Sequence, residues 1–129
     1  MDSKQPFYTP KIPRANPVIS QAVIAGGLIY LSGTVGVDPE TGKLIGATYA
    51  EQVPQAFHNI QTILEEAGSS MDKVIKTTVF MVAGEDHDFA IINKVYGDFF
   101  PVNPPARSAP QVMPFPGGIL ISVECIALL

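Results

Sequence analysis

The stretch from Thr48 to Gly68 carries the clearest periodicity in the chain and limits the folds open to it. Thr48 and Glu51 form a capping box that opens a helix, and Gly68 is suited to end it. Pro54 removes one helical hydrogen bond, so we expect either a late start near Val53 or a bend at the proline. The apolar residues recur every three or four positions, as on one face of an α-helix: Val53, Ala56, Phe57, Ile60, Ile63, Leu64 and Ala67.

Short β-strands account for most of the remaining sequence. The predicted strands are 20–25, 28–33, 74–82, 106–113 and 119–128. Gly26-Gly27 joins the first two, because paired glycines supply the positive φ of a tight hairpin turn. A second helix follows the acidic turn at 84–88. Its apolar face comprises Phe89, Ile92, Tyr96, Phe99 and Phe100.

The resulting order, β-β-α-β-α-β-β, predicts a single α+β domain over residues 1–129. Two helices are too few to cover both faces of a sheet, so both should lie on one face. The other face would be exposed and apolar unless another subunit covers it. Composition favours an oligomer, because 47% of the 129 residues are hydrophobic and only 16% are charged. Prolines at positions 6, 10, 13 and 17 predict an extended N-terminal arm over residues 1–17.

Charge and residue usage exclude several classes of function. The net charge of −4 argues against binding to a phosphate backbone, so we expect no nucleic-acid partner. Two distant histidines and a single cysteine give no metal signature and no disulfide framework. The longest apolar run, 23–31, is far shorter than the roughly 20 residues that span a bilayer. Without a membrane segment or a secretory signal, we expect a cytoplasmic protein, and a mitochondrial address stays open.

Arg107 is the first candidate site residue. It is the only charged residue in the segment 103–112, and Pro104 and Pro105 force an extended approach to it. A guanidinium held in this way offers a planar fork of donors that matches a carboxylate. A structural role is the alternative, in which Arg107 pairs with an acid such as Glu124 or lies on the surface.

Glu124 is the second candidate. Strand alternation places it on one face with Leu120, Ser122 and Ile126, so its surroundings are largely apolar. A buried carboxylate needs a partner, a bound water or a raised pKa, and both a salt bridge and a functional role are open. Our working hypothesis places an anion-binding Arg107 and a water-handling Glu124 in one small pocket.

Two further positions are suited to supporting roles. Asn93 lies on the inner side of the second helix, where it either hydrogen-bonds a loop carbonyl or orients a site residue. Within Ser32-Gly33-Thr34, Gly33 would let a ligand approach the backbone closely.

Taken together, these segments resemble the YjgF/RidA family of reactive-imine deaminases over roughly residues 20–127. The specific feature is the Pro-Ala-Arg-Ser block at 105–108. The other matching segments are 20–23, 31–33, 74–80, 88–90 with Asn93 and Tyr96, and 124–127. The resemblance implies a chorismate-mutase-like subunit in a homotrimer, with sites in clefts between subunits and no metal or organic cofactor. It also implies hydrolysis of 2-imino acids, such as 2-iminopropanoate and 2-iminobutanoate, to 2-keto acids and ammonia.

The same resemblance implies a role for each candidate. Arg107 falls on the arginine that holds the substrate carboxylate, and Glu124 on the glutamate that orients or activates water. Gly33 falls on the glycine whose backbone contacts the ligand, and Asn93 matches an asparagine near the cleft.

Three positions depart from the family pattern. Ile19 replaces the tyrosine that flanks the ligand, and Thr34 replaces the glutamine of Ser-Gly-Gln. Ala109 stands where many members have cysteine, although some carry alanine. These departures concern the shape of the pocket and therefore the substrate.

The leading hypothesis is a hydrolase acting on an imine or enamine conjugated to a carboxylate. One alternative is a pathway-specific relative that acts on a bulkier imine or enamine. Another is a non-catalytic protein that binds a small carboxylate in the same cleft. Ribonuclease activity, also attributed to the family, fits poorly with an acidic chain that has no histidine pair in the predicted cleft.

Overall fold

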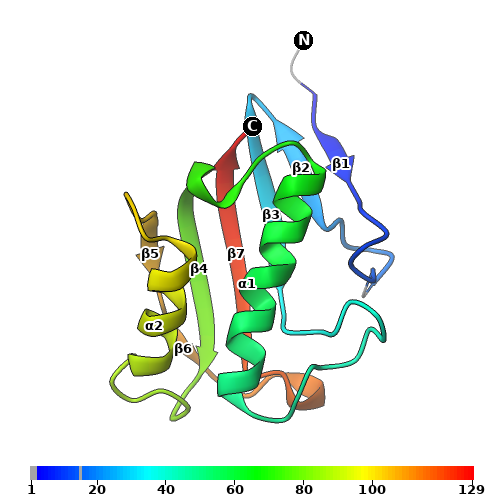
Figure 1. Ribbon diagram of the computed structural model, residues 1–129. Helices are drawn as coiled ribbons and strands as arrows, with labels where there is room; N and C mark the ends of the chain where they lie inside the picture. Colours follow the sequence, from blue (N-terminus) through cyan, green and yellow to red (C-terminus); the bar gives the residue numbers. More distant parts are fainter. Residues whose placement is uncertain (1–2, 15) are drawn as a thin grey trace.

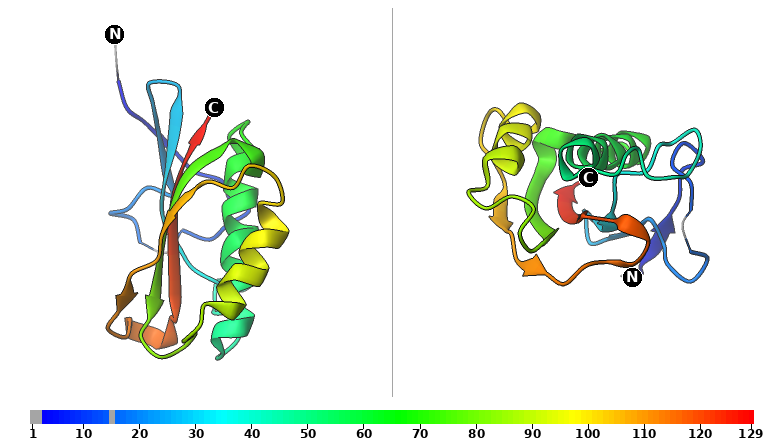
Figure 2. Two further views of the ribbon diagram at one scale, coloured as in Figure 1. Left: turned by 90° about the vertical axis from the view of Figure 1, so that its left-hand side faces the viewer. Right: turned by 90° about the horizontal axis from the view of Figure 1, so that it is seen from below.

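The computed structural model describes residues 3–14 and 16–129, and residues 1, 2 and 15 of the predicted arm lie outside it. Within the described residues the chain forms one seven-stranded mixed sheet with two α-helices on one face (Figure 1; Figure 2). The predicted α+β class, with both helices on one face, is confirmed. The strands are β1 (Gln5–Phe7), β2 (Ala22–Ala25), β3 (Leu28–Thr34), β4 (Val74–Val82), β5 (Ala106–Ser108), β6 (Gln111–Val112) and β7 (Ile121–Leu128). The helices are α1 (Tyr49–Glu66) and α2 (Ala90–Phe99), and short 3₁₀ turns lie at Met71–Lys73 and Pro116–Gly118.

The strand that comes last in the sequence lies in the middle of the sheet. The order is β1-β2-β3-β7-β4-β5, and β6 also pairs with β4. Strands β5 and β6 run parallel to β4, since α2 carries the chain back across the sheet. The other pairs are antiparallel. The hairpin prediction is confirmed, because Gly26 and Gly27, both with positive φ, join β2 to β3.

Helix α1 begins at the predicted capping box. The Thr48 hydroxyl accepts a hydrogen bond from the Glu51 backbone N–H at 3.2 Å, and Glu51 Oε1 accepts from the Thr48 N–H at 3.2 Å. The alternative of a late start near Val53 is therefore wrong. The helix runs from Tyr49 through Pro54, because the capping box fixes the first turn before the proline is reached.

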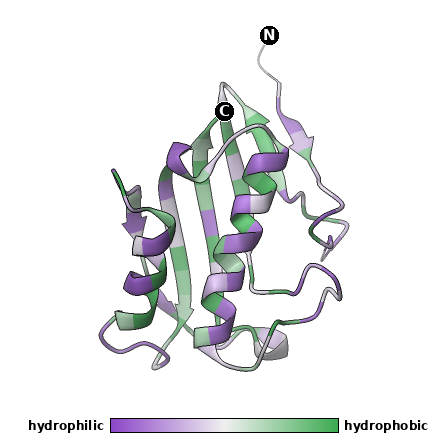
Figure 3. Cartoon of the chain, viewed as in Figure 1, coloured by the Kyte–Doolittle hydropathy of each residue, from purple (hydrophilic) through white to green (hydrophobic). Residues whose placement is uncertain are grey.

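The apolar face of α1 forms the centre of the core. Its residues pack against the inner faces of β3 and β7, in which hydrophobic segments are interrupted by less hydrophobic ones in Figure 3. The helix residues that are at most 2% exposed include Val53, Ala56, Phe57, Ile60, Ile63 and Leu64. Gly68, with a φ of 89°, ends the helix as predicted by leaving the right-handed region at no steric cost.

The N-terminal arm is more ordered than its prolines alone predicted. Residues Gln5–Phe7 form β1 and extend the sheet by pairing with β2. Further along, Ile12 is only 5% exposed and joins the core. The arm therefore covers one edge of the sheet and supplies core contacts, which proline content could not reveal.

The predicted strand 106–113 is divided into β5 and β6. Pro110 has no N–H to continue the ladder, and its carbonyl oxygen instead accepts from the Met81 N–H at 3.2 Å. Ala109 lies between the two short strands and packs against the core. The predicted single strand is therefore interrupted at 109–110.

The sheet face opposite the helices carries exposed apolar side chains. Tyr30 is 42% exposed, Ile75 43% and Leu128 47%. This confirms the expectation of an exposed, partly apolar face in the single chain.

Candidate functional site

Arg107 lies on β5, at the edge of the sheet that α2 covers. Its Nη1 donates to Asn93 Oδ1 at 2.8 Å, and its guanidinium carbon lies 4.9 Å from the centre of the Tyr96 ring. The two ion pairs among the described residues join other side chains, so Arg107 has no acidic partner there. Pairing with Glu124, the structural alternative, is not observed. The positive charge is held in a fixed orientation and left uncompensated.

The surface beneath Arg107 is fixed by buried hydrogen bonds. The Tyr96 hydroxyl lies 2.7 Å from Thr77 Oγ1, and burial raises the pKa of this tyrosine. The buried Asp86 carboxylate accepts from the N–H groups of Ile91 and Ile92 at 3.2 and 2.9 Å. It thereby caps α2, as the acidic turn at 84–88 predicted, and holds the helix that carries Asn93.

Glu124 lies on the other face of the sheet. It is exposed in the single chain, so the expected burial among apolar neighbours is wrong here. The register explains its position: Leu31 pairs with Cys125 and Thr34 with Val123, three steps along β3 against two along β7. This bulge sets Ser32-Gly33 opposite Glu124 and interrupts the regular ladder there.

Gly33 lies close to Ser122 of the neighbouring strand β7. A β-carbon built at this position would lie 2.5 Å from the Ser122 side-chain oxygen, so that hydroxyl would have to rotate away if a larger residue stood here. The predicted reason for Gly33 was the close approach of a ligand to the backbone. In the single chain, the missing side chain also leaves room for the Ser122 side chain of β7. Gly33 and Glu124 are brought together by adjacent strands.

A single chain does not bring Arg107 and Glu124 into one pocket. Arg107 pairs with Thr77, which pairs with Cys125, and the Cys125 side chain is buried on the helix-covered face. Side chains alternate along a strand, so Glu124 points to the opposite face. The sheet separates the two residues of the working hypothesis.

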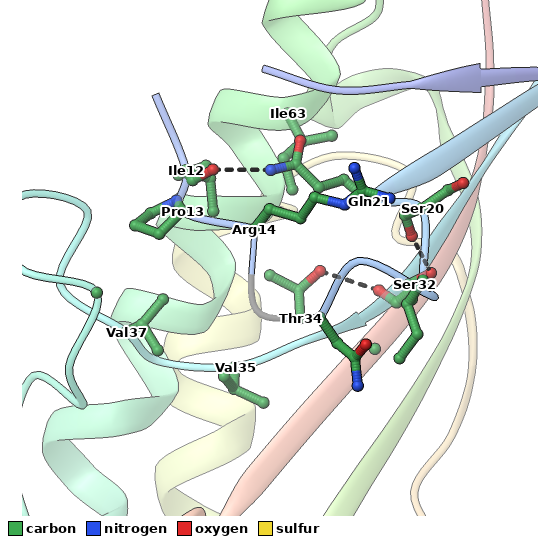
Figure 4. A pocket seen from close by; sticks show the side chains of 14 residues that line it. Ile12, Pro13, Arg14, Ser20, Gln21, Ser32, Thr34, Val35, Val37 and Ile63 are labelled. Carbon is green, nitrogen blue, oxygen red and sulfur yellow. Dashed lines mark hydrogen bonds between the residues drawn. The ribbon is translucent and has the colours of Figure 1, made fainter. Parts of the chain in front are cut away.

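Three of the ligand candidates line a pocket of about 340 Å³ between the N-terminal arm, β3 and α1, which we call the arm pocket (Figure 4). Ile19, Gly33 and Thr34 all contribute to its wall. Ile19 is 50% exposed, and the nearly buried Thr34 donates its hydroxyl to the Ser32 carbonyl at 2.9 Å. Ala109 is not part of this wall and lies near Arg107 in sequence.

Sequence reasoning overlooked one charged residue of this region. Arg14 lines the arm pocket, but it lies in a proline-rich stretch that was interpreted only as an extended arm. Its isolation from acidic residues within that stretch was the available signal.

Two classes of feature are missing from the part of the chain that the structure describes. It contains no group of three or more His, Cys, Asp or Glu side chains placed to hold a metal ion. Neither of its helices has the length and apolar character needed to cross a membrane.

Comparison with known proteins gives consistent matches over nearly the whole chain. The family model described as Endoribonuclease L-PSP matches residues 10–129. A Rattus norvegicus protein named 2-iminobutanoate/2-iminopropanoate deaminase is 41% identical over 120 residues, 93% of this chain and 86% of its own. The structure of RidA from the Antarctic bacterium Psychrobacter sp. has a TM-score of 0.87 at 38% identity, covering 97% of this chain and 99% of its own. That of E. coli TdcF with bound serine has a TM-score of 0.86 at 32% identity, covering 97% and 98%.

Proposed function

The chain belongs to the YjgF/RidA family, described as Endoribonuclease L-PSP, and from this premise we propose that it hydrolyses reactive 2-imino acids to 2-keto acids and ammonia. The observation that carries the proposal is the Arg107 guanidinium, fixed by Asn93 and Tyr96 and free of an acidic partner among the described residues. A relative of 41% identity carries the name of this activity. A structural neighbour of 32% identity was solved with bound serine, which has a carboxylate in the same position as that of a 2-imino acid.

The site is proposed to form between subunits of a homotrimer. Arg107 and Asn93 of one subunit would face Gly33 and Glu124 of the next, since one chain holds these two pairs on opposite faces of its sheet. Exposed apolar side chains around Glu124, such as Tyr30, favour coverage of this face by another subunit.

Arg107 would bind the substrate carboxylate. Its Nη1 is engaged by Asn93, which leaves the edge formed by Nε and Nη2 to donate two parallel hydrogen bonds. The electrostatic attraction fixes the imine carbon relative to the neighbouring subunit. Positioning of this kind supplies much of the acceleration of hydrolysis, because a protonated imine is already electrophilic.

Glu124 would handle the water. Its carboxylate takes a proton from the water while the water oxygen bonds to the carbon of the protonated imine, and the C=N electron pair moves to the nitrogen, which already carries its proton. Glu124 then returns its proton to the nitrogen of this carbinolamine. The C–N bond breaks, ammonia leaves, and the hydroxyl becomes the keto oxygen by giving its proton to Glu124, which passes it to the ammonia. The sum is protonated imino acid plus water giving keto acid plus ammonium.

Ammonia release is the direct test. Imines generated in situ from several amino acids by an oxidase are followed with and without the protein, and release should exceed the spontaneous rate. Saturable carboxylate binding without faster release would instead support the non-catalytic alternative. Faster release with large side chains alone would support the bulkier-imine alternative.

A further inference from the structure

The amide of Gln21, which forms part of the arm pocket, is fully engaged by the protein. Its nitrogen donates to the carbonyl oxygens of Thr9 and Ile12 at 3.2 and 2.7 Å, the second bond being visible in Figure 4. Its oxygen accepts from the Thr9 N–H at 2.8 Å. This side chain fastens the arm to the sheet and has no donor left for a ligand.

Two hydroxyl groups of the arm pocket, those of Ser32 and Thr34, are engaged in the same way. Ser32 donates to the Ser20 carbonyl oxygen at 2.6 Å, and Thr34 donates to the Ser32 carbonyl oxygen at 2.9 Å. Each hydroxyl has one proton to donate, and that proton is already used. Apolar residues make up much of the remaining wall, among them Ile12, Ile19, Val35, Val37 and Ile63. A ligand therefore meets a mostly apolar surface.

Arg14 differs from these polar groups because it carries a charge. It is the one charged side chain among the described residues that line the arm pocket, and its guanidinium carbon lies 4.2 Å above the Tyr8 ring. Nη2 donates to the Tyr8 hydroxyl at 2.9 Å and to the Pro17 carbonyl at 2.6 Å. Both ion pairs of the described chain lie elsewhere, so the charge has no acidic partner there. Nε and Nη1 remain as donors for an anion.

We propose that the arm pocket receives the side chain of the substrate and that Arg14 binds an acidic group at the end of that side chain. This rests on the proposed function, because it takes the imine carbon to lie near Gly33, which borders the same pocket. The substrate class is then a 2-imino acid with a short apolar chain that ends in a second carboxylate. Arg107 would hold the first carboxylate and Arg14 the second.

Matched imines test the assignment. Imines made in situ from glutamate and from norvaline have similar chain lengths and differ in the terminal carboxylate. Wild-type kcat/KM should favour the glutamate-derived imine by about tenfold, the contribution of one hydrogen bond to a charged group. Arg14→Gln should lower kcat/KM for the glutamate-derived imine to that for the norvaline-derived imine, while Arg14→Lys should retain part of the preference.

The matched control is Lys43→Gln, which removes the same charge from an exposed side chain near the arm pocket and outside its wall. It should retain the wild-type ratio. Equal losses for both imines in Arg14→Gln would show that Arg14 only holds the loop, and would overturn the assignment. Absence of any preference in the wild type would do the same.

Binding without turnover separates this inference from the proposed function. Ligand-observed NMR compares glutarate with pentanoate on wild type and on Arg14→Gln. Selective binding of glutarate that is lost in the variant supports the assignment even if no imine is hydrolysed. Equal binding of the two acids, or an unchanged glutarate signal in the variant, refutes it whether or not ammonia is released.

Discussion

Two arginines in this molecule lie over tyrosine rings, in surroundings that differ. Arg107 rests on Tyr96, whose hydroxyl bonds to Thr77 in the central part of the sheet. Arg14 rests on Tyr8 within an arm at the sheet edge and is exposed. The first is held by regular secondary structure and the second by a loop. Loops tolerate change more readily than strands and helices, so Arg107 is suited to chemistry common to all substrates, and Arg14 to selection among them.

Removal of Arg107 should lower kcat/KM more than substitution of any other residue of the proposed site. Arg107→Ala should lower kcat/KM about 30- to 5,000-fold for every imine, because losing one partner of a desolvated charge pair costs about 2–5 kcal/mol. Arg107→Lys should fail as well, since a point charge cannot reproduce the fork. Steady-state ammonia release gives both values. Near-normal activity in the lysine variant would assign Arg107 a structural role.

Substitution of Glu124 tests whether the chemical step depends on residues of the regular secondary structure. Glu124→Gln keeps the volume and removes the base, so kcat should fall on the order of 100-fold while KM changes little. Glu124 is exposed in the single chain, so the fold should tolerate the change. A change in KM alone would identify a binding or packing residue.

Mixed assemblies test which subunit supplies each residue. If Arg107 and Glu124 of one site come from different subunits, co-expressed Arg107→Ala and Glu124→Gln chains should regain activity in about a quarter of the sites of a random mixture. Each variant alone should stay inactive. Failure to regain activity in verified mixed trimers would place both residues in one subunit, against the geometry proposed here.

Removing the hydrogen bond from Asn93 should leave the Arg107 guanidinium less firmly oriented. Asn93→Ala removes the single hydrogen bond to Nη1, so kcat/KM should fall about 2- to 10-fold for all imines alike. Lys94→Ala, one residue along the same helix and exposed, is the control and should behave as wild type. A loss confined to one imine would mean that Asn93 contacts the substrate side chain.

The smallest expected effect concerns Ile19 in the arm pocket. Isoleucine leaves this wall apolar, and a tyrosine would narrow it and add a hydroxyl. Ile19→Tyr should shift the preference from the leucine-derived toward the alanine-derived imine by up to about tenfold. Competition between the two imines measures the ratio. A ratio that stays constant or moves the other way would show that Ile19 does not shape the pocket.

Local signals in the sequence account for the elements that were predicted well. The capping box at Thr48, the glycine pair at 26–27 and the β-branched run of β4 each act within a few residues, and the structure confirms all three. The division of strand 106–113 could have been inferred from Pro110, which has no N–H for the ladder. The exposure of Glu124 was missed because it depends on which elements cover each face of the sheet. The contact of Arg107 with Asn93 likewise needs the path of α2. The assigned roles of Arg107, Glu124, Gly33 and Asn93 in catalysis stay predictions.

The central place of β7 has a consequence for how the molecule is made. Strands β3 and β4 each pair with β7 rather than with each other, so the two halves of the sheet have no shared ladder until β7 has been synthesised. Nearly all of the stabilising pairs of the sheet's middle join distant parts of the sequence, which slows folding. A chain still emerging from the ribosome exposes two open strand edges, the template for mispairing. Glu124 arrives on the strand that closes this gap, so a ligand site can exist only after the sheet is whole.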